Sequence, residues 1–266
     1  MLRHVVSLFL LTATTAACNN GPEAPAGKDS IETVQPPPVV PEGNLPDSVR
    51  EQWVKRLAAR KDYTGALEQV NMLLQKDSAN PAWLFMKADA LEKKSDTTNA
   101  IRYFEQSIAE AGVFNEAEMR LANLYAETGH PKFLPLSEQL LRQPGTLAYR
   151  SDILLMKGIY YTRLYDHSRA LAVYDQIIRE DYSYLDAYIE KGLVYYDQKK
   201  YQPAYEVFRL STTVKNSFAD GYYWMARCEE QLNRSGEAAD NYKRALALDP
   251  SLEEARDGLK RLGQIN

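Results

Sequence analysis

The side chains that could do covalent or acid-base chemistry are few: two cysteines and three histidines. A nucleophilic cysteine needs a base within hydrogen-bond reach, and a metal site needs several converging His, Cys or carboxylate ligands. Cys228 has no histidine near it in the order of the chain, so we expect a buried, inert thiol. His130 and His167 lie in polar turns, where we expect them to be solvated. The sequence therefore predicts no enzyme, no metal, no cofactor and no small-molecule substrate.

Cys18 differs because it follows a stretch that has the features of an export signal. Residues 1–17 contain Arg3, then an apolar run over residues 5–11, then small residues up to Ala17. This pattern is typical of a signal peptide, and the apolar run is too short to span a bilayer. The small residues before Cys18 resemble the lipobox of bacterial lipoproteins, which implies lipidation of Cys18 and attachment to a membrane. A plain secretory leader with an incidental cysteine is the alternative.

Residues 18–46 are rich in proline and poor in bulky apolar residues. Seven of the thirteen prolines lie there, three of them at residues 36–38. Such a stretch cannot bury a core, and it is typical of a semi-rigid spacer or a disordered linker. The sequence thus predicts a folded domain over residues 47–266, preceded by a linker and a signal peptide.

Composition excludes one large class of partner. The chain is 45% hydrophobic and 26% charged, which is ordinary for a soluble fold, and its formal charge of −4 is spread along the chain. Neither a basic nucleic-acid footprint nor a polybasic membrane patch is present in the sequence. We therefore expect no nucleic acid as partner.

The structural elements that carry Cys228 and the two histidines of the folded domain repeat along the chain with a period of 34 residues. Each period contains two amphipathic stretches of helical spacing, separated by a polar break such as residues 197–200. A helical hairpin needs small residues where its helices cross closely, and bulky residues between one hairpin and the next. Four columns show this pattern: Gly158, Gly192 and Ala226; Ala170, Ala204 and Ala238; Tyr174, Phe208 and Tyr242; Leu154, Tyr188 and Tyr222.

These columns resemble the tetratricopeptide repeat, and the last period is the best match. It carries the family's small, aromatic and closing residues, which are Ala226, Ala238, Tyr242, Ala245, Asp249 and Pro250. The resemblance implies an all-α, right-handed superhelical solenoid of about six helix-turn-helix hairpins with a polar C-terminal capping helix. We place the repeats at 47–80, 81–114, 115–150, 151–184, 185–218 and 219–252, with the capping helix over 251–262.

The third repeat departs from the pattern. It is two residues longer than the others, and its second half contains Pro131, Pro135 and Pro144. Proline is tolerated only in the first turn of a helix. We therefore predict that this helix is short and begins near Pro135, with a bend in the solenoid.

The resemblance also implies where a partner binds, because in this family the first helix of each hairpin lines a concave groove. Helical spacing then gives the residues of one stripe, which are Phe85, Asp89, Met119, Asn123, Leu155, Ile159, Ile189, Leu193, Tyr196, Tyr223, Trp224 and Arg227. In the last three repeats the stripe is apolar and could form a peptide groove. Alternatively, tight curvature packs these residues against each other.

A ladder of carboxylates also repeats every 34 residues: Asp152, Asp186 and Asp220. It could select a basic partner at the edge of the groove. Each aspartate also lies in the first turn of a predicted helix, where the macrodipole favours negative charge. The two-carboxylate clamp of cytosolic chaperone cofactors in this family needs lysine and asparagine on matched helices, and only Asn123 fits.

The sequence as a whole predicts a non-catalytic adaptor of the bacterial cell envelope. The lipid would hold it on a membrane, and Asn19 after the cysteine favours the outer membrane. The groove would bind a peptide or helix of another envelope protein. The architecture resembles pilotins of type IV pilus secretins, and more loosely repeat lipoproteins of outer-membrane protein assembly or adaptors of peptidoglycan hydrolases. A pilotin-like assembly factor, an enzyme and a self-assembling structural module are the alternatives.

Overall fold

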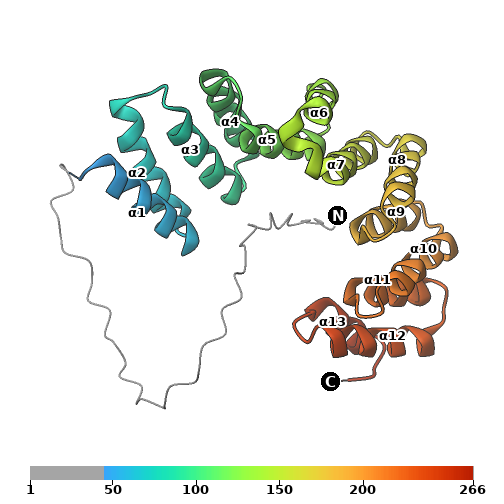
Figure 1. Ribbon diagram of the computed structural model, residues 1–266. Coiled ribbons are helices and arrows are strands. Elements are labelled where there is room, and N and C mark those ends of the chain that lie inside the picture. Colours follow the sequence, from blue (N-terminus) through green and yellow to red (C-terminus); the bar gives the residue numbers. More distant parts are fainter. Residues whose placement is uncertain (1–44, 266) are drawn as a thin grey trace, which may run out of the picture. The chain divides into compact units, whose positions relative to one another are not determined.

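A computed structural model describes residues 45–265 of the chain (Figure 1). Across these residues the regular structure is entirely helical, with no strand, and consecutive helices pack against each other. The predicted all-α solenoid is therefore confirmed. The expected signal peptide, Cys18 and nearly all of the proline-rich linker lie outside the described residues. None of the helices within residues 45–265 combines the length and the apolar character that crossing a membrane requires.

The helices pair into six hairpins, followed by one further helix at the C-terminal end of this unit (Figure 1). Their bounds are α1 (Asp47–Ala59), α2 (Tyr63–Lys76), α3 (Pro81–Lys93), α4 (Thr97–Ala111), α5 (Asn115–Thr128), α6 (Phe133–Arg142), α7 (Arg150–Arg163), α8 (His167–Glu180), α9 (Leu185–Asp197), α10 (Tyr201–Val214), α11 (Ala219–Gln231), α12 (Ser235–Leu248) and α13 (Glu253–Arg261), with a 3-10 helix η2 (Pro144–Tyr149) between α6 and α7.

The same turn closes every hairpin. In each turn, a residue shortly after the end of the first helix has a left-handed backbone, with φ between 58° and 66°. These residues are Lys61, Ser95, Gly129, Tyr165, Lys199 and Asn233. In each turn the N–H of this residue and that of the next one donate to carbonyls of the last helical turn, as Asp62 N–H does to Leu57. This is the Schellman arrangement that ends a helix by satisfying its free carbonyls. In three turns an aspartate follows and caps the second helix, as Asp62 does by accepting from the N–H of Gly65.

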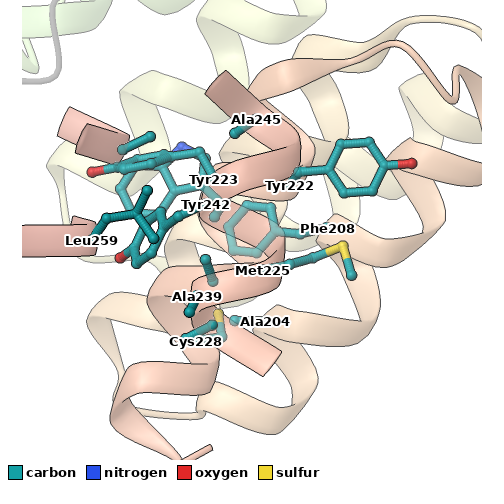
Figure 2. Close-up of a cluster of buried hydrophobic side chains, with 14 of the residues drawn as sticks. Ala204, Phe208, Tyr222, Tyr223, Met225, Cys228, Ala239, Tyr242, Ala245 and Leu259 are labelled. Atoms are coloured by element: carbon teal, nitrogen blue, oxygen red, sulfur yellow. The ribbon is translucent and has the colours of Figure 1, made fainter. Parts of the chain in front are cut away.

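The core forms where aromatic rings meet the small-residue columns. A Cβ added to Gly158 would overlap the ring of Tyr174, and one added to Gly192 would overlap the ring of Phe208. Both rings are fully buried. Figure 2 shows the same packing around the last hairpin, where Phe208 and Tyr242 lie among Ala204, Ala239 and Ala245. The predicted columns are therefore the close helix crossings of the solenoid.

The second helix of the third repeat is short, as predicted. It has ten residues, begins at Phe133 and holds Pro135 in its first turn. The sequence did not predict η2, whose Thr146 hydroxyl donates to the carbonyl of Leu140 and closes the connection to α7. Beside this short helix, α5 packs directly against α7, and Phe133 of α6 stacks on Tyr160 of α7 with ring centroids 4.9 Å apart.

The last helix, α13, covers the end of the array. It buries Ala255, Gly258 and Leu259 against α12 and exposes charged residues on its other face. A Cβ on Gly258 would meet the ring of Tyr242. The predicted polar capping helix is thus confirmed, beginning at Glu253 rather than at residue 251.

Candidate partner-binding surface

The first helices of the hairpins carry the predicted stripe, and the structure divides its residues into two groups. Five are buried in the interior: Met119, Leu155, Leu193, Tyr223 and Trp224. Seven keep part of their surface exposed: Phe85, Asp89, Asn123, Ile159, Ile189, Tyr196 and Arg227. The buried group behaves as the packed alternative predicts, because α9 directly contacts both α7 and α11, and α5 contacts α7. Only the second group is available to a partner.

The N-terminal part of the stripe is already neutralised within the chain. The Nη2 atom of Arg120, on α5, lies 2.7 Å from a carboxylate oxygen of Asp89 and 2.7 Å from one of Glu92, both on α3. Burial raises the pKa of Glu92, and the charge of Arg120 opposes that rise. Asn123 donates to Glu127 at 3.1 Å. This part of the surface therefore offers a partner few unpaired charges.

The C-terminal part is built around the cation of Arg227. Its Nη1 donates to the Tyr223 hydroxyl at 2.9 Å and its Nη2 to the Tyr196 hydroxyl at 3.4 Å. The rings of Tyr196, Tyr223 and Trp224 all have their centroids within 5.9 Å of the guanidinium carbon. Burial alone would lower the pKa of Arg227, yet the two tyrosines raise it above its usual value. The group is therefore a fixed cation, held in place by aromatic rings.

An acidic residue of α11 continues this network toward the end of the array. Glu230 lies 3.7 Å from Nε of Arg227, and it accepts hydrogen bonds from the Tyr242 hydroxyl at 2.5 Å and from Arg261 of α13 at 3.1 Å. The sequence argument missed Arg120 and Arg261 as partners of the stripe. Opposite charges on the first helices of neighbouring repeats are the signal that could have identified them.

Glu190 of α9 is a second residue that the sequence argument did not single out. The same position is Met156 one repeat earlier and Trp224 one repeat later, so a carboxylate stands in a bulky apolar column. No hydrogen bond or ion pair of this carboxylate occurs within residues 45–265. Burial, with a smaller effect of Asp186, raises the pKa of Glu190 to about 7. A carboxyl group beside the stripe residue Ile189 thus has a pKa near neutral pH.

Two matches to the tetratricopeptide repeat identify the family of this chain. They cover residues 52–113 and 155–213, and residues 219–252, which together make up more than half of the sequence. The chain belongs to the tetratricopeptide repeat family.

Solved structures agree with this assignment at the level of the fold. A tetratricopeptide repeat protein from Parabacteroides merdae superposes with a TM-score of 0.64 at 15% identity, over 84% of this chain and 86% of that chain. PilW, described as a widely conserved type IV pilus biogenesis factor, gives a TM-score of 0.61 at 16% identity, over 81% and 99% of the two chains.

A curated relative is similar in sequence over part of its length. Hsp70-Hsp90 organizing protein 3 from Arabidopsis thaliana is 28% identical over 186 residues. The match spans 68% of this chain and 31% of the relative. Most of the relative therefore lies outside the comparison.

The remaining chemical candidates of this repeat protein are placed in the core or against aromatic rings. Cys228 is fully buried, and burial raises the pKa of its thiol to about 12, so it is not a thiolate at neutral pH. The sequence led us to expect two solvated histidines, but both contact aromatic rings. His130 stacks on Tyr125 with ring centroids 4.3 Å apart, and His167 meets the ring of Tyr165 edge-on. No group of three metal-ligating side chains occurs in the described part of the chain.

Proposed function

We propose that this repeat protein is a non-catalytic adaptor that binds a segment of another envelope protein on the inner surface of its C-terminal repeats. Its N-terminus supports the rest of the proposal. The signal-peptide pattern of residues 1–17 and the position of Cys18 favour a lipoprotein, anchored most readily in the outer membrane. The linker over residues 18–46 would let the array reach partners away from the lipid.

The observation that carries the binding proposal is a set of four partly exposed residues, which we call the inner cluster: Ile159, Ile189, Tyr196 and Arg227. Apolar and aromatic groups that are exposed to water stabilise a complex when a partner covers them. Arg227 is held rigidly by hydrogen bonds to two tyrosines, so binding would cost little additional ordering. An extended peptide or a helix with apolar side chains and a carboxylate suits this surface.

A second candidate is a pilotin-like assembly factor for an outer-membrane or secretion machine. PilW, which is named as a pilus biogenesis factor, shares its fold with this chain along 99% of its own length. This candidate differs from the first only in the partner, which would be a subunit of that machine.

Photo-crosslinking in cells tests the inner cluster. A photoreactive amino acid at position 196 should capture a distinct partner, whereas the same group at position 165 should not, because Tyr165 lies exposed in a hairpin turn. Tyr196→Ala should reduce capture from a probe at position 189 by about tenfold or more, with unchanged helical content. Equal capture from positions 196 and 165, or no effect of Tyr196→Ala, would rule out the inner cluster as the binding surface.

A further inference from the structure

Exposed apolar side chains gather in the connections that lead into the first helices of the hairpins. Val113 precedes α5, Leu147 and Tyr149 precede α7, and Tyr182 precedes α9. Their exposed fractions are 73%, 60%, 41% and 72%. Large apolar residues exposed singly are ordinary, but a row of them in successive repeats forms a surface that water covers unfavourably.

Contacts between neighbouring connections place these segments beside one another. The side chain of Asn115 lies against Gly145, which joins the α5 end of the row to η2. Arg150 pairs with Glu180 at 3.1 Å, and the Tyr184 hydroxyl donates to Asp152 at 2.5 Å. These contacts place the connection before α7 beside the connection before α9. We call this surface the connection edge.

A row of carboxylates lies along the same edge, with one carboxylate in the first turn of each of α5, α7, α9, α11 and α13. The row is longer than the three aspartates found in the sequence, because Glu116 and Glu254 stand in the same register. Its members are Glu116 of α5, Asp152 of α7, Asp186 of α9, Asp220 of α11 and Glu254 of α13. Apolar and acidic residues therefore alternate along the edge from α5 to α9.

The carboxylates of this row repel each other. Partial burial and the charge of Asp152 raise the pKa of Asp186. Burial and the charges of Asp249, Asp186 and Glu254 raise the pKa of Asp220. An aspartate that caps its own helix behaves in the opposite way: hydrogen bonds from Arg169 lower the pKa of Asp166. Helix stabilisation alone thus does not account for the row, whose repulsion a cationic partner would relieve.

We propose that the connection edge binds a basic segment of another protein, in which lysine or arginine recurs about every third residue with apolar residues between. Helices in contact lie about 8–10 Å apart, which sets the spacing of the carboxylates from one repeat to the next. A polyproline II chain has about three residues per turn and rises ~3.1 Å per residue. Every third side chain therefore faces the row at a matching interval. The acidic row disfavours an anionic bilayer as the occupant.

Synthetic peptides test this proposal with the full chain. The first probe repeats Lys-Leu-Ser, the second repeats Glu-Leu-Ser, and the third repeats Lys-Ser-Ser. Fluorescence anisotropy should show binding of the first, weakening as salt rises, with binding of the other two about tenfold weaker or absent. Equal binding of the Lys-Ser-Ser and Lys-Leu-Ser peptides would mean unspecific charge attraction and would overturn the proposal.

Variants locate the binding site. Asp186→Asn with Asp220→Asn, and separately Leu147→Ser with Tyr182→Ser, should each weaken binding of the Lys-Leu-Ser peptide about tenfold. The control Leu164→Ser with Tyr165→Ser changes two exposed apolar residues of a hairpin turn and should leave binding unchanged. Equal loss in the control would place the site elsewhere. Self-association that Leu147→Ser with Tyr182→Ser abolishes would assign the edge to a second copy and would also overturn the proposal. If a variant loses helical content, the peptide series on the unaltered chain decides.

Discussion

Two partly buried charged side chains of the first helices, Arg227 and Glu190, meet the cost of desolvation in different ways. Arg227 is surrounded by aromatic rings, donates to two tyrosine hydroxyls and lies 3.7 Å from a carboxylate oxygen of Glu230, so its charged form is stabilised. Glu190 has no such partner within the described residues, and its neighbours include the carboxylates of Asp186 and Asp197. A buried group without a partner avoids the cost by changing its protonation state. Glu190 is therefore a residue through which pH should change the stability of the array.

Glu190→Gln should stabilise the protein above neutral pH and have little effect in acid. The pKa of Glu190 is about 7 in the fold, against 4.5 for an unperturbed group. As pH rises from 4.5 to 7 the unfolded chain loses this proton first, so stability falls and the full penalty is present above pH 7. Removing the penalty should raise stability by about 1–3 kcal/mol at alkaline pH. Thermal melts at acidic and alkaline pH measure the difference.

Glu110→Gln is the matched control for this change, because Glu110 is an exposed residue of α4. Its melting temperature should follow that of the unaltered chain at every pH. A gain from Glu190→Gln that is the same in acid and in alkali would contradict the assignment of the pKa.

At the scale of the helical hairpin, stability depends on how closely the two helices approach. Gly192 of α9 and Phe208 of α10 show this, because no Cβ fits between the glycine backbone and the ring. The ring in turn fills the space that the glycine leaves. The pair is repeated by Gly158 and Tyr174 in the preceding hairpin, so the crossing is a property of the repeat.

Gly192→Ala should destabilise the protein by roughly 1–3 kcal/mol, because the added methyl group forces the ring or the helix to shift. Gly236→Ala is the control, since a Cβ on Gly236 meets nothing within 4 Å. That change should be neutral or stabilising by about 0.4–1 kcal/mol, because alanine restricts the unfolded chain. The melting temperature should therefore fall for Gly192→Ala and stay the same or rise for Gly236→Ala. A similar loss in both would mean that close packing at Gly192 is not the cause.

The hairpins could be predicted from sequence because their columns depend on local spacing alone. Gly158, Tyr174 and their equivalents recur at a fixed period, and the prolines of the third repeat indicated the short α6. Exposure of the stripe could not be predicted in the same way. Burial of Leu155 and Tyr223 depends on how closely neighbouring first helices approach, which is a property of curvature and not of any one period. The 3-10 helix η2 was missed because so short an element leaves no periodic signal.

At the scale of the whole chain, the proposed role requires that the array be held at a membrane. The proposal rests on Cys18, which directly follows the signal-peptide pattern of residues 1–17. Acyl chains contribute about 0.8 kcal/mol for each buried methylene group, so two or more chains would anchor the protein stably.

Cys18→Ser should move the protein from the membrane fraction to the soluble fraction of the envelope, because the acylated sulfur is lost. Cell fractionation followed by immunoblotting measures this. Cys228→Ser is the control: this buried thiol plays no part in anchoring, so the variant should stay with the membrane. Membrane association of Cys18→Ser equal to that of the unaltered chain would rule out a lipid anchor at this residue.

The direct packing of α5 on α7 limits how this chain can be divided into modules. A solenoid in which each repeat touches only its neighbours can gain or lose repeats by duplication and deletion, because every joint is equivalent. Here the joint between the third and fourth hairpins is more extensive than the contacts of α9 with α7 and α11, because α5 packs along α7 and Phe133 stacks on Tyr160. A deletion that removed the third hairpin would leave Tyr160 without Phe133. We therefore expect related proteins to vary in repeat number at either end of the array, and to keep the third and fourth hairpins together as one inherited unit.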